Sequence, residues 1–183
     1  MDFDALLKEA GRYESRLRAH RRALHHIPEL GYEEHETHAY LMEHLRALAP
    51  DDLKTFARTG IRAVFRGDGT GRVIAFRSDI DALPIQEATG RDYASCHSGK
   101  MHACGHDCHT AMLLGAAKIL TQHREEIHGT VKLLFQMAEE IGTESRRYVE
   151  KGALADVSAI FGMHIWATLE SGTVNIDDGP RMA

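Results

Sequence analysis

Short apolar segments alternate along this chain with stretches of helical periodicity, and this alternation limits the folds open to it. Val131–Phe135 and Val157–Met163 have the length and composition of buried strands, and Gly60–Phe65 and Val73–Phe76 are strand-like too. Thr110–Leu120 is strongly apolar and long enough for a buried helix. Helices that alternate with buried strands predict an α/β domain with a mostly parallel sheet and helices on both faces.

Two amphipathic helices are expected before the first strand, at residues 3–27 and Glu33–Leu48, and each ends before a proline. Glycines within residues 67–71 can supply the positive φ values that a tight turn between strands requires. Residues 80–106 have no long periodic run and are expected to form mostly loop. The last expected elements are a short helix at Glu144–Lys151 and a final strand at Gly172–Ile176.

The composition excludes several classes of protein. The chain has 183 residues, 43% of them hydrophobic, and a formal net charge of −5, which argues against disorder and against nucleic acid as the main partner. No apolar stretch approaches the roughly 20 residues that span a bilayer. The N-terminus mixes charges through its apolar positions, unlike a signal peptide. We therefore expect a cytoplasmic protein of one domain that binds neither nucleic acid nor membrane.

Histidine and cysteine are concentrated in one short stretch. Four of the 13 histidines and two of the three cysteines lie within residues 97–109, and an odd number of clustered cysteines is not typical of a disulfide framework. Thiolate and imidazole are good ligands for zinc and similar transition metals. Only Gly105 separates Cys104 from His106, so both side chains can reach one metal centre. A thiolate near a helix N-terminus is also electrostatically favoured.

A structural zinc knuckle is the alternative interpretation of this cluster. His102 and His106 match the H-x3-H half of such a site, but the chain has no C-x2-C pair to complete it. The surrounding helices and strands also have no obvious need of a metal to fold. We expect Cys96, His97 and Cys108 to be structural or incidental.

A pair of glutamates, Glu139 and Glu140, directly follows the buried strand Val131–Phe135. Sites in open α/β sheets gather at the carboxyl ends of strands. Adjacent residues in an irregular turn point in different directions, so one carboxylate can ligate a metal while its neighbour holds a water. The pair Glu125–Glu126 lacks such a position and is expected to be a solvated face.

Polar residues follow two other strand-like runs. His164 comes at the end of Val157–Met163, and three polar sites at successive junctions favour convergence over coincidence. Asp79 and Asp81 follow Val73–Phe76, and either one can orient a ligand histidine or serve as a turn carboxylate.

With these residues in place, the chain resembles the co-catalytic metal amidohydrolases that include hippurate hydrolase, N-acyl-amino-acid amidohydrolases and plant auxin-conjugate hydrolases. The matching stretches are HRRALHHIPELGYEEHET, RSDIDALPIQEATGRDYAS, MHACGHDCHTAMLLGAAKIL, FQMAEE and GMHIWATLESGTV. They span nearly the whole chain in the expected order, and jointly they are specific.

The resemblance implies a zinc-exopeptidase-like catalytic domain that binds two divalent ions, which can be zinc, manganese, cobalt or nickel. It implies hydrolysis of the amide bond of a small N-acyl amino acid. Alternatives are a metallo-dipeptidase or carboxypeptidase of the same superfamily, or a metal-binding fragment without activity. The roles it implies are metal ligation by Cys104, His106, Glu140 and His164 and general-base catalysis by Glu139. We further expect Asp79 and His109 to orient the ligands from behind.

The chain departs from the family at Cys108, where relatives usually have glycine, and at Met137, where they usually have proline. Relatives are also longer. They continue into a lid and dimerisation domain and then return to the catalytic domain with one more histidine ligand. Residues 1–183 are therefore expected to be the N-terminal portion of the catalytic domain, incomplete without that return, and the full-length protein is expected to form a homodimer through the lid.

Overall fold

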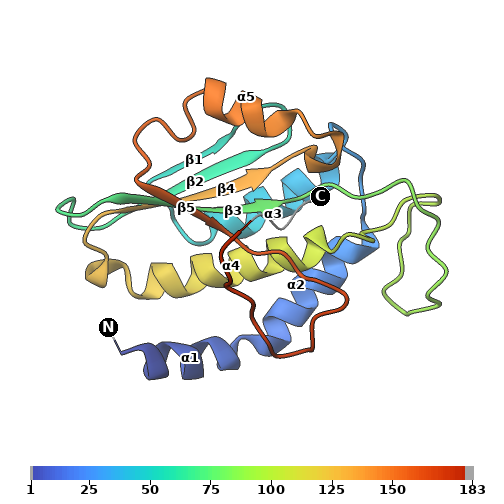
Figure 1. Cartoon of the computed structure of the whole chain (residues 1–183), viewed down its shortest axis with the longest axis horizontal. Helices are drawn as coiled ribbons and strands as arrows, with labels where there is room; N and C mark the ends of the chain where they lie inside the picture. Colours follow the sequence, from blue (N-terminus) through green and yellow to red (C-terminus); the bar gives the residue numbers. More distant parts are fainter. Residues whose placement is uncertain (1, 180–183) are drawn as a thin grey trace.

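The computed structural model describes residues 2–179, which form a single sheet covered by helices (Figure 1). The strands are β1 (Asp52–Thr55), β2 (Ile61–Arg66), β3 (Val73–Asp79), β4 (Thr130–Gln136) and β5 (Ala159–Gly162). The helices are α1 (Phe3–Arg12), α2 (Glu14–His26), α3 (His35–Arg46), α4 (His106–Gln122) and α5 (Glu144–Glu150), with 3-10 turns at Arg124–Glu126 and Glu139–Ile141.

The sheet has the strand order β1-β2-β4-β3-β5. Strands β4, β3 and β5 run parallel, as the sequence predicts, while β1 and β2 extend the sheet by antiparallel pairing. The carboxyl ends of β3 and β4 therefore lie side by side, with Asp79 opposite Gln136. Residues that follow these two strands are brought to the same edge of the sheet.

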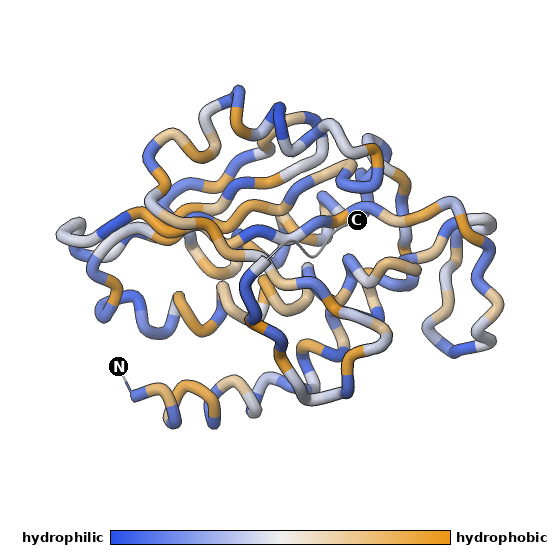
Figure 2. The backbone as a smooth tube through the Cα atoms, viewed as in Figure 1, coloured by the Kyte–Doolittle hydropathy of each residue, from blue (hydrophilic) through white to orange (hydrophobic). Residues whose placement is uncertain are grey.

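Helices cover the sheet on both sides, as predicted. In Figure 1, α3 and α4 lie below the sheet with α2 beneath α4, and α5 lies above it. Strand β4 is buried along almost its whole length because both of its faces are covered. Figure 2 shows apolar residues along the central strands and polar residues on the outer loops.

The first predicted helix is two helices. Residues 3–27 contain a break at Tyr13, whose N–H bonds to the carbonyls of Ala10 and Gly11 and ends α1. Gly11 lies two residues before Tyr13 and weakens helix formation there. Helix α1 buries none of its residues, so packing against the core does not straighten it.

Several strand predictions also differ from the structure. Residues 67–71 do not close a hairpin, because β4 inserts between β2 and β3. Strand β1 was not expected from its sequence, DLKT, which has no apolar alternation. Residues 172–176 form no strand. Strand β5 is short and mostly exposed rather than buried. Among residues 2–179, no helix combines the length and apolar character needed to cross a bilayer.

Candidate metal centre

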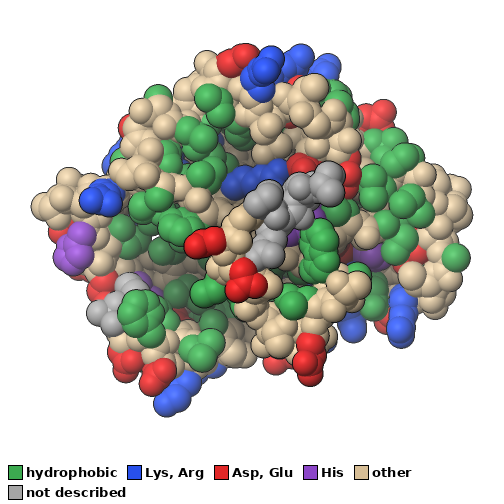
Figure 3. Space-filling model, in the orientation of Figure 1, with side chains coloured by type: hydrophobic (Ala, Val, Ile, Leu, Met, Phe, Trp, Pro, Cys, Tyr) green, Lys and Arg blue, Asp and Glu red, His purple; other side chains and the backbone are tan. Residues whose placement is uncertain are grey.

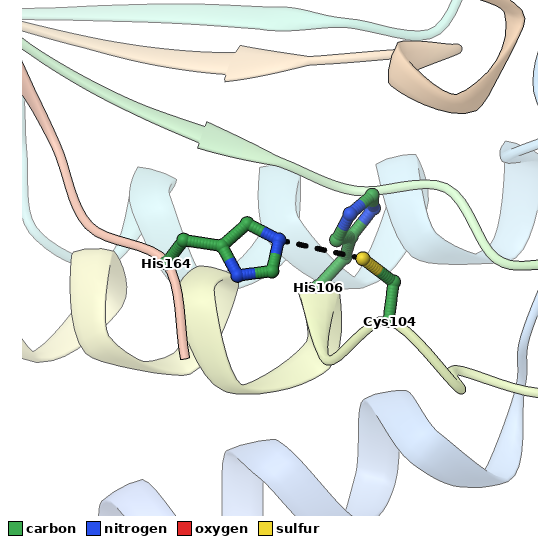
Figure 4. A group of neighbouring side chains, drawn as sticks. All are labelled: Cys104, His106 and His164. Carbon is green, nitrogen blue, oxygen red and sulfur yellow. Dashed lines mark hydrogen bonds between the residues drawn. The ribbon is translucent and has the colours of Figure 1, made fainter. Parts of the chain in front are cut away.

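The N-terminus of α4 presents Cys104 and His106 to the same point (Figure 4). Gly105 lies between them at φ +102°, a left-handed conformation that glycine adopts readily. A Cβ at this position would lie 2.3 Å from Cδ1 of Ile165. Gly105 is therefore required both by the backbone turn and by the close approach of the segment that follows β5.

His164 reaches the centre from that segment. Its Nε2 lies 3.4 Å from Sγ of Cys104, although the two residues are 60 positions apart in the chain (Figure 4). The next residue, Ile165, donates its backbone N–H to Nε2 of His109 at 3.0 Å. The structure thus brings together Cys104, His106 and His164, which the sequence predicts to converge.

Glu139 and Glu140 lie on the turn after β4. The Nε2 atom of His106 is 3.8 Å from Oε2 of Glu139 and 3.6 Å from Oε1 of Glu140. The N–H of Glu140 donates to Oδ2 of Asp81 at 3.0 Å. Both glutamates are partly exposed, so a small molecule in solution can reach them. Glu125 and Glu126, by contrast, are exposed and belong to none of the candidate ligand groups among residues 2–179.

Asp79, the last residue of β3, is almost fully buried behind the centre. Its Oδ1 is 2.6 Å from Nδ1 of His109, and its Oδ2 is 2.8 Å from Nη1 of Arg77 and 3.6 Å from Nε2 of His106. Because Nε2 of His109 accepts the Ile165 N–H, its Nδ1 bears the proton and donates to Asp79. Both nitrogens of His109 are thus engaged in holding neighbouring segments.

Residues 2–179 contain three groups of side chains that could hold a metal ion. Within each group, the ligand atoms lie within 4.8 Å of one another. His106 belongs to every one of them, and both of its ring nitrogens are buried without a hydrogen bond. Such an orphaned imidazole, together with a thiol and several carboxylates, fits a divalent transition metal. The groups are Cys104, His106 and His164; Asp79, His106 and His109; and His106, Glu139 and Glu140.

The charges around the centre shift the pKa values of its groups. Burial, reinforced by the nearby Glu140 carboxylate, raises the pKa of the Cys104 thiol to about 12. Burial alone would lower the pKa of His106, but Asp81 and Asp79 raise it overall. The surplus of carboxylates gives the centre a negative potential that favours cations.

Other residues singled out from the sequence lie outside this centre. His102 is buried and belongs to none of the three groups, so the zinc-knuckle interpretation has no support among the described residues. Cys96 is exposed, and His97 places its Nδ1 2.9 Å from the carbonyl oxygen of Pro28. Cys108 is partly buried and is a free thiol.

Glu34 supports the centre from outside the ligand cluster, and the sequence alone does not predict this role. Glu34 is fully buried and accepts the N–H of Ala138, directly before the glutamate pair. Glu34 lies in the stretch GYEEHET, which carries part of the family resemblance but predicts no role for this glutamate. The one sequence signal for this role is a glutamate in a stretch that is otherwise typical of a helix N-terminus.

The chain belongs to peptidase family M20/M25/M40, whose model matches residues 75–179. It is 47% identical over 176 residues to an N-acetylcysteine deacetylase of Bacillus subtilis, covering 93% of this chain and 45% of that protein. It is 47% identical over 163 residues to an IAA-amino acid hydrolase of Arabidopsis thaliana, covering 89% of this chain and 37% of the relative.

The fold matches a crystal structure of the same family. That protein is described as a dinuclear metal-binding peptidase of Bacillus subtilis, and it superposes with a TM-score of 0.87 at 45% identity. The match covers 93% of this chain and 48% of the other. The chain thus spans less than half the length of the relatives named here.

Proposed function

We propose that this chain forms part of a metal-dependent amidohydrolase that cleaves N-acyl amino acids into a carboxylic acid and an amino acid. The observation that carries the proposal is the position of His106, whose buried ring lies among a thiol, a second histidine and several carboxylates. The deacetylase and the auxin-conjugate hydrolase among the relatives support this substrate class.

In this proposal Cys104, His106, Glu140 and His164 hold two divalent ions. Divalent ions would supply Lewis-acid chemistry, which polarises an amide carbonyl and makes water reactive near neutral pH. Glu139 is partly exposed beside His106 and takes the proton from the attacking water, then gives it to the leaving amine. Asp79 fixes His109, which in turn holds Ile165 and so places His164.

The test measures metal content and hydrolysis separately. The purified chain, and any longer product of the same gene, is analysed for zinc, manganese, cobalt and nickel and assayed on hippurate, N-acetyl amino acids and dipeptides. Cys104→Ser should lose metal, whereas Glu139→Gln should keep metal and lose turnover by about 10²–10⁴-fold. Cys96→Ser, an exposed cysteine outside the centre, is the matched control. A Glu139→Gln variant with full activity would exclude the base assignment.

A dipeptidase or carboxypeptidase is the second candidate, and the similarity to a solved structure described as a peptidase favours it. Preference for dipeptides over N-acetyl amino acids in the same assay would select it. A chain that binds metal but hydrolyses nothing, while a longer product is active, would identify residues 1–183 as the N-terminal portion of the catalytic domain. We propose that such a longer product forms the homodimer.

A further inference from the structure

The turn that presents the glutamate pair begins at a strained residue. Ala138 has φ +50° and ψ +42°, a left-handed conformation that residues with a Cβ rarely adopt. Ala138 is also fully buried. Such a conformation persists only where surrounding contacts impose it.

Glu34 makes the contact that fits this requirement. Its Oε1 accepts the backbone N–H of Ala138 at 2.8 Å, and its Oε2 accepts the hydroxyl of Thr59. Both Glu34 and Thr59 are buried, so water does not compete for these bonds. The loop before Glu34 presses on the same turn, because a Cβ on Gly31 would lie 3.0 Å from Cα of Ala138.

A second carboxylate holds the opposite side of the turn. Asp81 accepts the N–H of Glu140 and also lies 3.3 Å from Nδ1 of His106. Asp81 therefore contacts a candidate ligand directly. Glu34 differs, because its carboxylate accepts from the main chain of the turn and from Thr59, and Glu34 belongs to none of the three ligand groups.

We propose that Glu34 is a positioning residue for Glu139 and Glu140, which it keeps facing His106 by holding Ala138 in its left-handed conformation. The inference rests on the proposed metal site for its functional meaning. Whether Glu34 imposes the left-handed backbone at Ala138 can be tested without measuring activity.

The first experiment follows the Ala138 amide by hydrogen exchange, using NMR of the metal-free chain. Glu34→Gln keeps an acceptor oxygen and should leave exchange at this amide within threefold, whereas Glu34→Ala should accelerate it at least tenfold. Glu144→Ala is the matched control, since Glu144 is another fully buried carboxylate but accepts from Tyr32 and pairs with Arg147. Unchanged exchange at Ala138 in Glu34→Ala would overturn the proposal.

The second experiment titrates each variant with cobalt(II), whose thiolate charge-transfer band reports Cys104. Glu34→Ala should weaken cobalt binding at least tenfold while the band persists, and Glu34→Gln should bind like the parent. Equal affinity in Glu34→Ala and the parent would refute the positioning role. If the parent itself binds no cobalt, the proposed function fails, and amide exchange alone still decides whether Glu34 holds the turn.

A double variant keeps the proposal testable if Glu34→Ala does not fold. Glycine adopts the left-handed conformation without strain, so Ala138→Gly should reduce the dependence on Glu34. The double variant Glu34→Ala/Ala138→Gly should fold. It should also recover at least half of the loss in cobalt affinity that Glu34→Ala causes, measured on a logarithmic scale. A double variant as impaired as Glu34→Ala would show that Glu34 acts through something other than the Ala138 backbone.

Discussion

The two halves of the candidate centre are held in very different ways. Asp79, His106 and His109 lie at the junction of β3 and α4, with side chains that are at most 2% exposed. His164 comes from the β5 segment, residues 159–179, in which almost every residue is exposed. One half is fixed by the core, and the other rests on its surface.

The exposed half is also unusually apolar. Phe161, Met163, Ile165 and Trp166 are each at least 43% exposed. Figure 3 shows the face of the molecule on which β5 lies, and hydrophobic side chains are frequent there. This difference indicates that folding of the domain and assembly of the site are separable. The core half should set the stability of the fold. The β5 segment should set how completely the ligands converge.

The largest expected effect tests this division by comparing two phenylalanines. Phe135 in β4 is fully buried, so Phe135→Ala should lower the free energy of unfolding by about 3–5 kcal/mol. Phe161 in β5 is 54% exposed, and its ring centroid lies 5.8 Å from that of Phe76, so Phe161→Ala should cost less than about 1 kcal/mol. Urea unfolding of both variants measures the difference. Similar losses would mean that Phe161 is covered in solution.

The sequence predicted the core half well because local pattern and burial agree there. The apolar run Val131–Phe135 and the helix Thr110–Leu120 are both present, each extended by a few residues. The extension of α4 back to His106 was missed, because polar residues at a helix start do not follow the apolar period. The extension of β3 to Asp79 was missed for the same reason.

The exposed half was predicted less well for a different reason. Val157–Met163 has the apolar composition of a buried strand, but composition does not reveal whether a neighbouring strand covers it. His164 was nevertheless found, because it follows an apolar run in the way that the glutamate pair does. Contacts between distant loops, such as Glu34 with Ala138, leave no pattern in a single sequence.

His109 links the two halves, so its removal should have the next largest effect. His109→Ala removes the bond to Asp79 and the bond to the Ile165 N–H, and should lower the free energy of unfolding by about 1–3 kcal/mol. Hydrogen exchange at the Ile165 amide should accelerate more than exchange in β4. His128→Ala, which removes an exposed histidine paired with Asp68, should cost no more than about 0.5 kcal/mol. Unchanged exchange at Ile165 would argue against the link.

The smallest expected effect is a pH dependence that arises behind the core half. The buried His25 lies 2.7 Å from Asp107 through Nδ1 and 3.3 Å from Glu87 through Nε2. The hydrogen bond to Asp107 raises the pKa of His25 above its ordinary value of 6.5, against the opposing effect of burial. Arg21 also pairs with Asp107, at 3.0 Å, and limits the shift.

Because the folded-state pKa of His25 is raised, its protonation adds stability that is complete below pH 6.5 and is lost as the pH rises through the folded-state pKa. The free energy of unfolding of the metal-free chain should therefore decline as the pH rises from 6 to 8. His25→Gln should flatten this decline, and Glu87→Gln should flatten it less, since Glu87 is the weaker partner. Urea unfolding at several pH values measures the slopes. If His25→Gln leaves the slope of the parent intact, the pH dependence arises from other groups and not from this buried ion pair.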